Sequence, residues 1–253
     1  MVRLITIPIS HYCEKARWAL DLARVDYREE PHVQVVHAFH ARRLAGNRTV
    51  PVLVTPERIL GESDEIVRWA DARMPEESRL FPDERLAREE VESLCARFDS
   101  ELGPKGRRLI YVHMFDEDRD YALRVNDQGV PPWEDWMIRH SWPLAERMLG
   151  KLLGITPGVE VEDEASVFRE LDFVAERLAD GRPYLCGERF TAADLTFAAL
   201  AGSVVLPTQY GVELPRPSSL SPRTAALVER VREHPAGRHA LTMFAEHRQP
   251  LAR

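Results

Sequence analysis

The sequence predicts a small α/β domain followed by an all-α domain, and three observations lead to this fold class. The first eighty residues alternate short β-rich runs with helical patterns of apolar residues. After Pro82 the patterns are helical, and strand patterns are absent. Residues 74–83 contain two prolines and several charges, which is typical of a boundary. We therefore place the α/β domain at residues 1–77 and the all-α domain at residues 86–253.

The first domain is predicted to run in the order β-α-β-α-β-β-α. Ala16, Ala19 and Leu20 recur at the spacing of one helix face. The pair Pro56-Glu57 separates two β-rich runs, which indicates a hairpin. In chain order, we expect strands at residues 2–7, 26–33, 50–54 and 58–60, and helices at residues 13–24, 36–44 and 63–73. This alternation favours a small α/β sandwich.

The second domain is predicted to consist of helices alone. Asp83 can cap a helix, and the pair Gly103-Pro104 is expected to end it. Another helix has an apolar face that begins at Val167, and Gly181 follows its end. Further helices are expected near residues 106–125, 133–153, 191–204, 220–233 and 236–247.

Composition and charge are those of an acidic, water-soluble globular protein. Of the 253 residues, 44% are apolar and 30% are charged, which is enough apolar content for a sizeable core. The net charge of −7 opposes nucleic-acid binding, because a phosphate backbone requires a basic surface. The longest mostly apolar stretch, residues 195–206, is shorter than the ~20 residues of a membrane span.

The cysteines and the first residues predict a cytoplasmic protein. Cys13, Cys95 and Cys186 are an odd number at wide spacing, which suits a reducing compartment and not a disulfide framework. Met1 leads directly into an apolar run, without the basic leader of a secreted protein. We therefore expect a cytoplasmic location, with neither a membrane nor a nucleic acid as partner.

The first strand leads through the short loop P-I-S-H-Y-C directly into a helix. A side chain just before a helix lies near the positive end of its dipole and near free N–H groups, which stabilise an anion such as a thiolate. Ser10 and Cys13 have the spacing S-x-x-C, which differs from a redox C-x-x-C motif by one hydroxyl. The spacing alone also permits a structural role, in which Ser10 caps the helix and Cys13 packs inside its first turn.

Two later segments have the chemistry to bind a peptide-like ligand. Val50-Pro51 stands at the start of a strand, where proline is allowed and its peptide bond can be cis. A cis bond would turn the backbone groups of Val50 outward, toward an extended ligand. Glu62 and Ser63 open a helix, whose free N–H groups suit a carboxylate. Both segments also have an explanation without a ligand, as an edge-strand proline and as a simple helix cap.

Taken in chain order, these segments form a longer pattern. A strand is followed by S-H-Y-C at a helix start, by T-V-P-V-L about forty residues on, and ten residues later by G-E-S-D-E-I-V-R-W. Residues 183–195 read P-Y-L-C-G-E-R-F-T-A-A-D-L, in which Thr191 and Asp194 form a capping box and Phe190 and Leu195 occupy staple positions. Together the two patterns resemble the glutathione S-transferase superfamily, in its serine-type, cytosolic and bacterial-like form.

The resemblance implies a thioredoxin-like, glutathione-binding first domain and a helical second domain of the glutathione-transferase type. It also implies that the Ser10 hydroxyl donates a hydrogen bond to the glutathione sulfur and lowers the pKa of that thiol, without attacking itself. Val50, before a cis Pro51, would pair its backbone with the cysteinyl part of glutathione. Glu62 would bind the ammonium of the γ-glutamyl end, and Ser63 would bind its carboxylate.

The resemblance suggests three more site residues. His37, or else His40 or Arg48, lies where a polar or basic residue contacts the glycyl carboxylate. Tyr12 and Trp136 are candidates for the pocket of an apolar electrophile.

Two departures from the family pattern concern subclass and reactivity more than fold. His11 replaces the proline that is common after the active-site residue. Ala45-Gly46 replaces the usual Asn-Pro before the V-P motif. Residues 104–160 carry no motif that would assign a subclass.

No metal ion is expected, and three functions are weighed. His32, His37 and His40 are close in sequence, but no carboxylate or cysteine is positioned with them by sequence. We expect a homodimeric enzyme that conjugates glutathione, as co-substrate, to an apolar electrophile. The alternatives are a glutathione-dependent thiol reductase or peroxidase that uses Cys13, and a non-catalytic glutathione-fold binding protein. The spacing favours the transferase, because Cys13 stands where the resolving cysteine of a redox pair lies.

Overall fold

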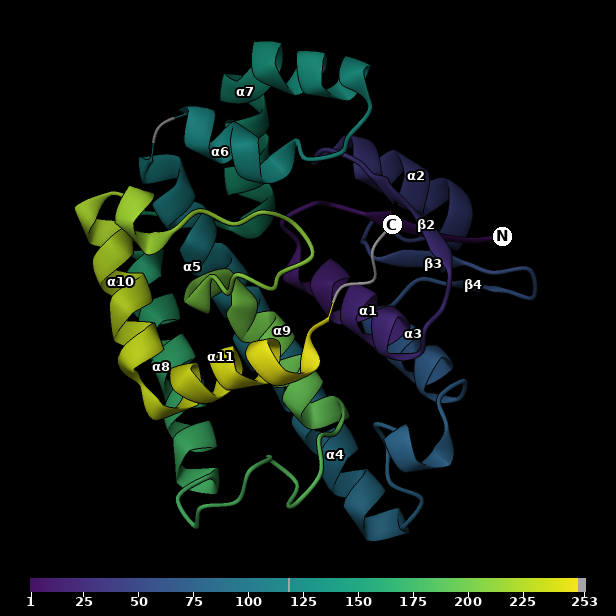
Figure 1. Ribbon diagram of the computed structural model, residues 1–253. Helices are drawn as coiled ribbons and strands as arrows, with labels where there is room; N and C mark the ends of the chain where they lie inside the picture. The colour runs from purple at the N-terminus through teal and green to yellow at the C-terminus, as the bar shows by residue number, and fades with distance from the viewer. Residues whose placement is uncertain (118, 250–253) are drawn as a thin grey trace.

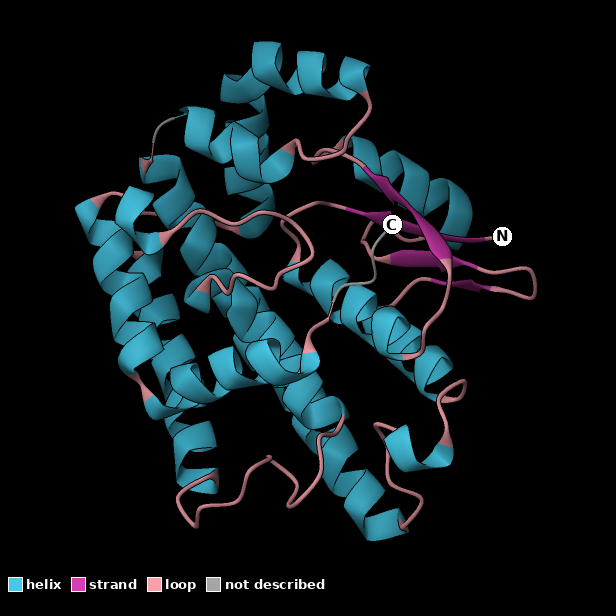
Figure 2. Ribbon diagram, viewed as in Figure 1, coloured by secondary structure: helices cyan, strands magenta, loops and turns pink. Residues whose placement is uncertain are grey.

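The computed structural model describes residues 1–117 and 119–249, and its first part is a four-stranded sheet covered by helices on both faces (Figures 1 and 2). The strands are β1 (Val2–Thr6), β2 (Tyr27–Pro31), β3 (Val52–Val54) and β4 (Ile59–Leu60), in the spatial order β2-β1-β3-β4. Strand β1 pairs in parallel with β2 and antiparallel with β3, and β3 pairs antiparallel with β4. The mixed sheet and the order βαβαββα confirm the predicted α/β sandwich.

Alternation along the strands explains why helices cover both faces of this sheet. Successive strand residues point to opposite faces, so Leu4 and Leu53 join one core while Ile5 and Val52 join another. The first core includes residues of α1 (His11–Leu22) and α3 (Ser63–Asp71). The second includes Ala41 of α2 (Val36–Ala45) on the opposite face. Both faces of the sheet are therefore removed from water.

The rest of the described chain is helical. Part of it packs around one central helix, and part forms a second, smaller core. Helix α9 (Ala192–Val205) is buried along its whole length, because nearly all its residues are apolar or small. The helices that accompany it are α4 (Arg85–Arg97), α5 (Gly103–Asp116), α6 (Arg119–Asn126), α7 (Pro132–Leu153), α8 (Val159–Arg177), α10 (Pro222–Glu233) and α11 (Pro235–His247). Figure 1 shows α9 between this helical layer and α1 of the α/β domain. The boundaries of the two domains at 1–77 and 86–253 stay a prediction.

Three details of the helical part differ from the sequence expectations. Glu84, and not Asp83, caps α4, because its carboxylate accepts hydrogen bonds from the N–H groups of Leu86 and Ala87, at 3.0 and 2.6 Å. The pair Gly103-Pro104 does not end the helical structure, because both residues belong to the first turn of α5. A π-helical turn, Phe98–Leu102, leads directly into α5, and the missing N–H of a proline in a first helical turn costs nothing there.

The helix expected near residues 106–125 is two helices, α5 and α6, which end and begin on either side of residue 118. That residue lies outside the described ones.

The predicted capping box at the start of α9 is confirmed. The Thr191 hydroxyl accepts from the Ala193 N–H at 3.3 Å, and the Asp194 carboxylate accepts from the Thr191 N–H at 3.0 Å. Asp194 also accepts from the Leu185 N–H at 2.7 Å. Fully buried, Asp194 therefore fixes both the helix start and the loop before it. Phe190 stacks on Trp18 of α1, which joins this helix start to the α/β domain.

A buried network of ion pairs joins α1 to Arg248, which follows helix α11. The guanidinium of Arg248 donates to Glu14 at 2.6 Å and to Asp21 at 2.7 Å. Arg17, also on α1, donates to Glu29 of β2 at 2.7 Å. Because Glu14 and Arg248 are almost wholly buried, each charge depends on its partner for the solvation that water would otherwise supply. This network fixes the position of α1, whose first turn borders the cavity described below.

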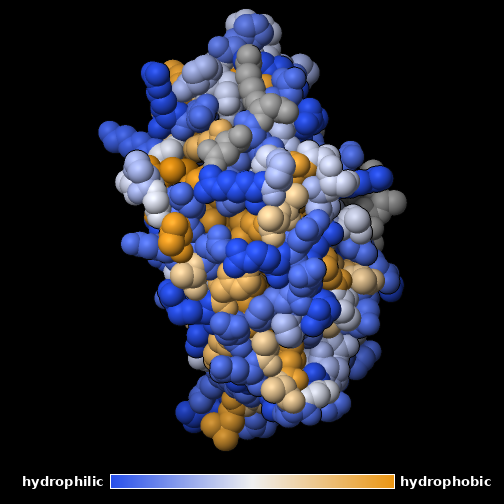
Figure 3. Space-filling view, turned by 90° about the vertical axis from the view of Figure 1, so that its left-hand side faces the viewer, coloured by the Kyte–Doolittle hydropathy of each residue, from blue (hydrophilic) through white to orange (hydrophobic). Residues whose placement is uncertain are grey.

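Within the described residues, no helix is both long and apolar enough to cross a membrane. Figure 3 shows the face that carries α8 and α10, where hydrophobic residues are interspersed with hydrophilic ones.

Candidate functional site

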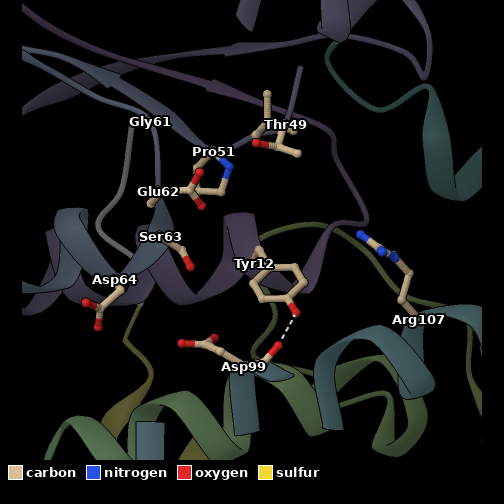
Figure 4. A pocket seen from close by; sticks show the side chains of 10 residues that line it. Tyr12, Thr49, Pro51, Gly61, Glu62, Ser63, Asp64, Asp99 and Arg107 are labelled. Carbon is tan, nitrogen blue, oxygen red and sulfur yellow. Dashed lines mark hydrogen bonds between the residues drawn. The ribbon is translucent and has the colours of Figure 1, made fainter. Parts of the chain in front are cut away.

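A cavity of about 330 Å³ lies between the starts of α1 and α3 and the beginning of α5. Its size falls within the range of pockets that bind small molecules. Both domains contribute residues to its lining (Figure 4), which consists of Tyr12, Thr49, Val50, Pro51, Gly61, Glu62, Ser63, Asp64, Asp99 and Arg107.

The first turn of α3 forms one wall of the cavity. The N-cap of this helix is Glu62 and not Ser63, so that Ser63 is the first helical residue. The N–H groups of this turn have no partner within their own helix, and they lie where the dipole of α3 is positive. Figure 4 shows the Ser63 hydroxyl pointing toward the cavity. A hydroxyl beside such N–H groups forms a good site for a carboxylate.

The next wall is the start of β3. The Val50–Pro51 peptide bond is cis, and both residues line the cavity. On the same side, Asn47 donates to the carbonyl oxygen of Gly61 at 3.0 Å and to the Glu62 carboxylate at 3.3 Å. The hydrogen bond from Asn47 fixes the Glu62 side chain near the start of β3, and the Glu62 carboxylate lines the cavity.

The opposite wall joins the two domains through Tyr12 and Asp99. The Tyr12 hydroxyl donates to the backbone carbonyl of Asp99 at 2.9 Å (Figure 4), and burial raises the pKa of Tyr12 to about 12. The Asp99 carboxylate accepts from the buried Lys15 ammonium at 2.7 and 2.9 Å. The Tyr12 hydroxyl and the Asp99 carboxylate thus both have partners within the protein. We interpret this wall as a structural contact between the domains, and not as a source of a catalytic acid.

Arg107 brings a positive charge to the cavity from α5. Within the described part of the chain, no hydrogen bond or ion pair joins its side chain to another residue. Its neighbour Arg108 points elsewhere, and it donates twice to the buried Asp163, at 2.6 and 2.7 Å. The cavity thus has the carboxylates of Glu62 and Asp64 on one side, of which Asp64 also accepts from Arg68 at 2.9 Å, and the cation of Arg107 across from them. This arrangement fits a zwitterionic ligand.

Models of one protein family match both domains. The model described as "Glutathione S-transferase, N-terminal domain" matches residues 4–78, and that described as "Glutathione S-transferase, C-terminal domain" matches residues 160–230. Together they cover more than half of the chain. The chain belongs to the glutathione S-transferase superfamily. Its first domain is therefore thioredoxin-like and its second is the helical domain of this family, as predicted.

Solved structures agree with this assignment at the level of the fold. A glutathione S-transferase from Xanthobacter autotrophicus Py2 is 18% identical, with a TM-score of 0.64 over 97% of this chain and 93% of that one. Another, from Methylobacillus flagellatus KT with glutathione bound, is 18% identical, with a TM-score of 0.57 over 95% and 98%. Glutathione transferase F2 from Populus trichocarpa is 16% identical, with a TM-score of 0.58 over 97% and 99%. No curated protein matches the chain.

In this member of the superfamily, Ser10 is the N-cap of α1. Its side-chain oxygen accepts from the Cys13 N–H at 3.4 Å, and Cys13 is fully buried. Ser10 is half-buried and is not among the residues that line the cavity, although Tyr12, two residues further, is. Its hydroxyl proton is still available, because the cap uses only the oxygen as an acceptor. Ser10 therefore has the capping role that its spacing from Cys13 permits. This role leaves its hydroxyl free to donate a hydrogen bond to a ligand.

His11 and Cys13 are uncharged at neutral pH in this environment. Burial, together with the nearby Arg107, lowers the pKa of His11 to about 3. Burial raises the pKa of the Cys13 thiol to about 11, although Arg17 and Ser10 act in the opposite direction. All three cysteines are free thiols, as expected.

The structure does not bring His37 or Trp136 to the cavity. His37 lies on α2, where burial lowers the pKa of its imidazole to about 4. Trp136 lies on α7 with 63% of its surface exposed, and its ring stacks on His140. Their roles toward glutathione and the electrophile stay predictions, as do those of the other site residues.

Sequence reasoning did not single out Asp64, Asp99 or Arg107 as cavity residues. Asp64 lies within the pattern that carries Glu62 and Ser63, whereas Arg107 lies in residues 104–160, which carry no motif of the family. The pair Arg107-Arg108 is adjacent in sequence, and only the helix position decides that one faces Asp163 and the other the cavity. No signal in the sequence distinguishes the two.

Proposed function

We propose that this protein binds glutathione in the cavity and transfers it to an apolar electrophile. One observation carries the proposal. The fold places the backbone of Val50, at the start of β3, beside Glu62 and Ser63, at the start of α3, in a single cavity. These are the groups that an extended peptide with a charged amino-terminal end requires.

Each part of glutathione has a complementary group in the cavity. Its ammonium would lie beside Glu62 and Asp64, and the neighbouring carboxylate would accept from the Ser63 hydroxyl and N–H. The backbone of Val50 would pair with the central, cysteinyl part. Arg107 is the cation of the lining, and it would attract a carboxylate of the ligand from the other side.

The sulfur of glutathione would then lie near the start of α1. There the helix dipole favours the thiolate over the thiol. The Ser10 hydroxyl, which still has its proton to donate, would add a hydrogen bond to the sulfur and lower its pKa further. Holding the electrophile close to this thiolate supplies the rest of the rate enhancement, because the two reactants no longer have to meet in solution.

The buried state of Cys13 supports a transferase over a thiol reductase. A reductase needs an accessible thiolate, whereas Cys13 has no exposed surface and a pKa raised to about 11. Glu62 and Arg107 form no ion pair among the described residues, and such charges beside a cavity favour a ligand-binding protein over a scaffold that binds no ligand. A homodimer in the cytoplasm is part of the same proposal.

Turnover of two substrates by three variants tests the reaction. With an aromatic halide, Ser10→Ala should lose about tenfold in rate at neutral pH, because one hydrogen bond to a charged sulfur is removed while the helix dipole remains. Cys13→Ser and Cys13→Ala should retain conjugation. Reduction of a glutathione mixed disulfide should stay negligible in the wild type.

The opposite pattern would refute the transferase proposal. Folded Cys13 variants, as judged by circular dichroism, would then lose activity while Ser10→Ala retained it. Mixed-disulfide reduction by the wild type would in that case identify a reductase.

A further inference from the structure

Three side chains with metal-binding chemistry lie together between the two domains, and none of them lines the cavity. His32 follows strand β2, His40 lies in the middle of α2, and Glu134 lies in the first turn of α7. Each offers a ligand atom, and these atoms all lie within 4.8 Å of one another. Histidine and carboxylate ligands of this kind are typical of divalent transition-metal sites.

Glu134 holds one of the two rings in place. Its Oε1 lies 2.7 Å from the Nδ1 of His32, and its Oε2 accepts from the Val33 N–H at 2.9 Å. Glu134 is completely buried, so its carboxylate is a costly group in a place that water does not reach. The two hydrogen bonds fix its position beside Nδ1 of His32, which is the nitrogen that an ion between these two side chains would bind.

His40 completes the group and has the freedom to adjust. Its ring stacks on that of His32, with the ring centroids 3.8 Å apart and the planes inclined by 14°. His40 is only half-buried, unlike the other two. Around a tetrahedral ion with bond lengths of about 2.1 Å, the ligand atoms lie about 3.4 Å apart. A rotation of the His40 side chain, which the exposed surface of α2 permits, would bring its nitrogen to that spacing.

We propose that His32, His40 and Glu134 bind a divalent transition-metal ion, with Zn²⁺ as the best fit to two imidazoles and one carboxylate. A fourth position stays open for water. The ion would connect β2 and α2 of the first domain to α7 of the second, so its effect would be to stabilise the contact between the domains. The proposal does not depend on glutathione binding, because His32, His40 and Glu134 do not line the cavity.

Calorimetric titration of the untagged protein with ZnCl₂ alone tests the site. We expect one Zn²⁺ per chain and a rise of the unfolding temperature with Zn²⁺ concentration, since an ion that binds only the folded state stabilises it. His40→Ala should weaken binding by at least about tenfold and remove the thermal shift. Because His40 is half-exposed, this variant should fold.

The matched control is His140→Ala, which removes an exposed histidine from the same helix as Glu134. It should bind Zn²⁺ as the wild type does, and Glu134→Gln should behave like His40→Ala. Absence of stoichiometric binding by the wild type, or equal binding by the His40 and His140 variants, would overturn the proposal. In either case the cluster would be only a structural hydrogen-bonded contact.

Discussion

Two regions around helix α1 differ in whether their charged side chains are paired within the protein. Toward the chain end, Glu14 and Asp21 are buried and both are paired with Arg248. At its first turn, the helix borders a cavity where Arg107 has no partner among the described residues. A buried charge that is paired within the protein holds the fold, and a charge left free beside a cavity is available to a ligand. The paired face therefore determines stability, and the cavity face determines binding.

The largest effect is expected on the paired face. Arg248→Met removes the cation that the buried carboxylates of Glu14 and Asp21 share, although Arg17 stays 3.5 Å from Glu14. It should lower the free energy of unfolding by about 3–5 kcal/mol. Urea unfolding measures this change. Glutathione affinity should be unaltered at a temperature where the variant is folded. Arg58→Met, on an exposed turn, is the control and should change stability little. A loss below about 1 kcal/mol for Arg248→Met would contradict the role of the network.

The buried imidazole of His11 should make the free energy of unfolding decrease as the pH is lowered. The pKa of His11 is about 3 in the folded protein, below its ordinary value of 6.5, so the unfolded state alone takes up a proton between these values. Stability from this group is complete above pH 6.5 and declines by up to about 1.4 kcal/mol per pH unit as the pH falls. Urea unfolding between pH 7 and pH 5 should show a shallower decline for His11→Gln. Identical slopes for wild type and variant would disprove the burial of a neutral His11.

The smallest effect is expected from replacing Arg107, the cavity residue whose charge has no partner among the described residues. Arg107→Ala should weaken glutathione binding about two- to fivefold, because Arg107 is exposed and water screens its charge. The difference should shrink as salt is raised from 50 to 500 mM. Lys105→Ala removes a cation two residues away that does not line the cavity, and it should leave affinity unchanged. Equal effects of the two substitutions would mean that Arg107 acts only through net charge.

The sequence was most informative where a signal is local. The strand and helix order of the first domain, the capping box of Thr191 and Asp194, and the cavity segments Val50-Pro51 and Glu62-Ser63 are contiguous patterns, and the structure places all of them as elements or cavity walls. The start of α3 at Ser63 also agrees with the expected helix, and Glu62 is its N-cap.

What the sequence could not supply is contact between distant segments. No carboxylate lies near His32 and His40 in the sequence, and the fold brings Glu134 to them, from 102 residues beyond His32. Gly103-Pro104 reads as a helix stop, yet the π-helical turn before it lets the path continue into α5. Both cases depend on packing, which periodicity and spacing do not encode.

Calorimetric titration of glutathione into the wild type and Ser63→Ala tests the central claim most directly. The wild type should bind one glutathione per chain, and Ser63→Ala should raise the dissociation constant about tenfold or more, because a hydrogen bond to a carboxylate is worth about 1.5–3 kcal/mol. Ser166→Ala, on α8 and outside the cavity lining, should bind as the wild type does. No binding by the wild type, or equal constants for both serine variants, would contradict the assignment of the cavity to glutathione.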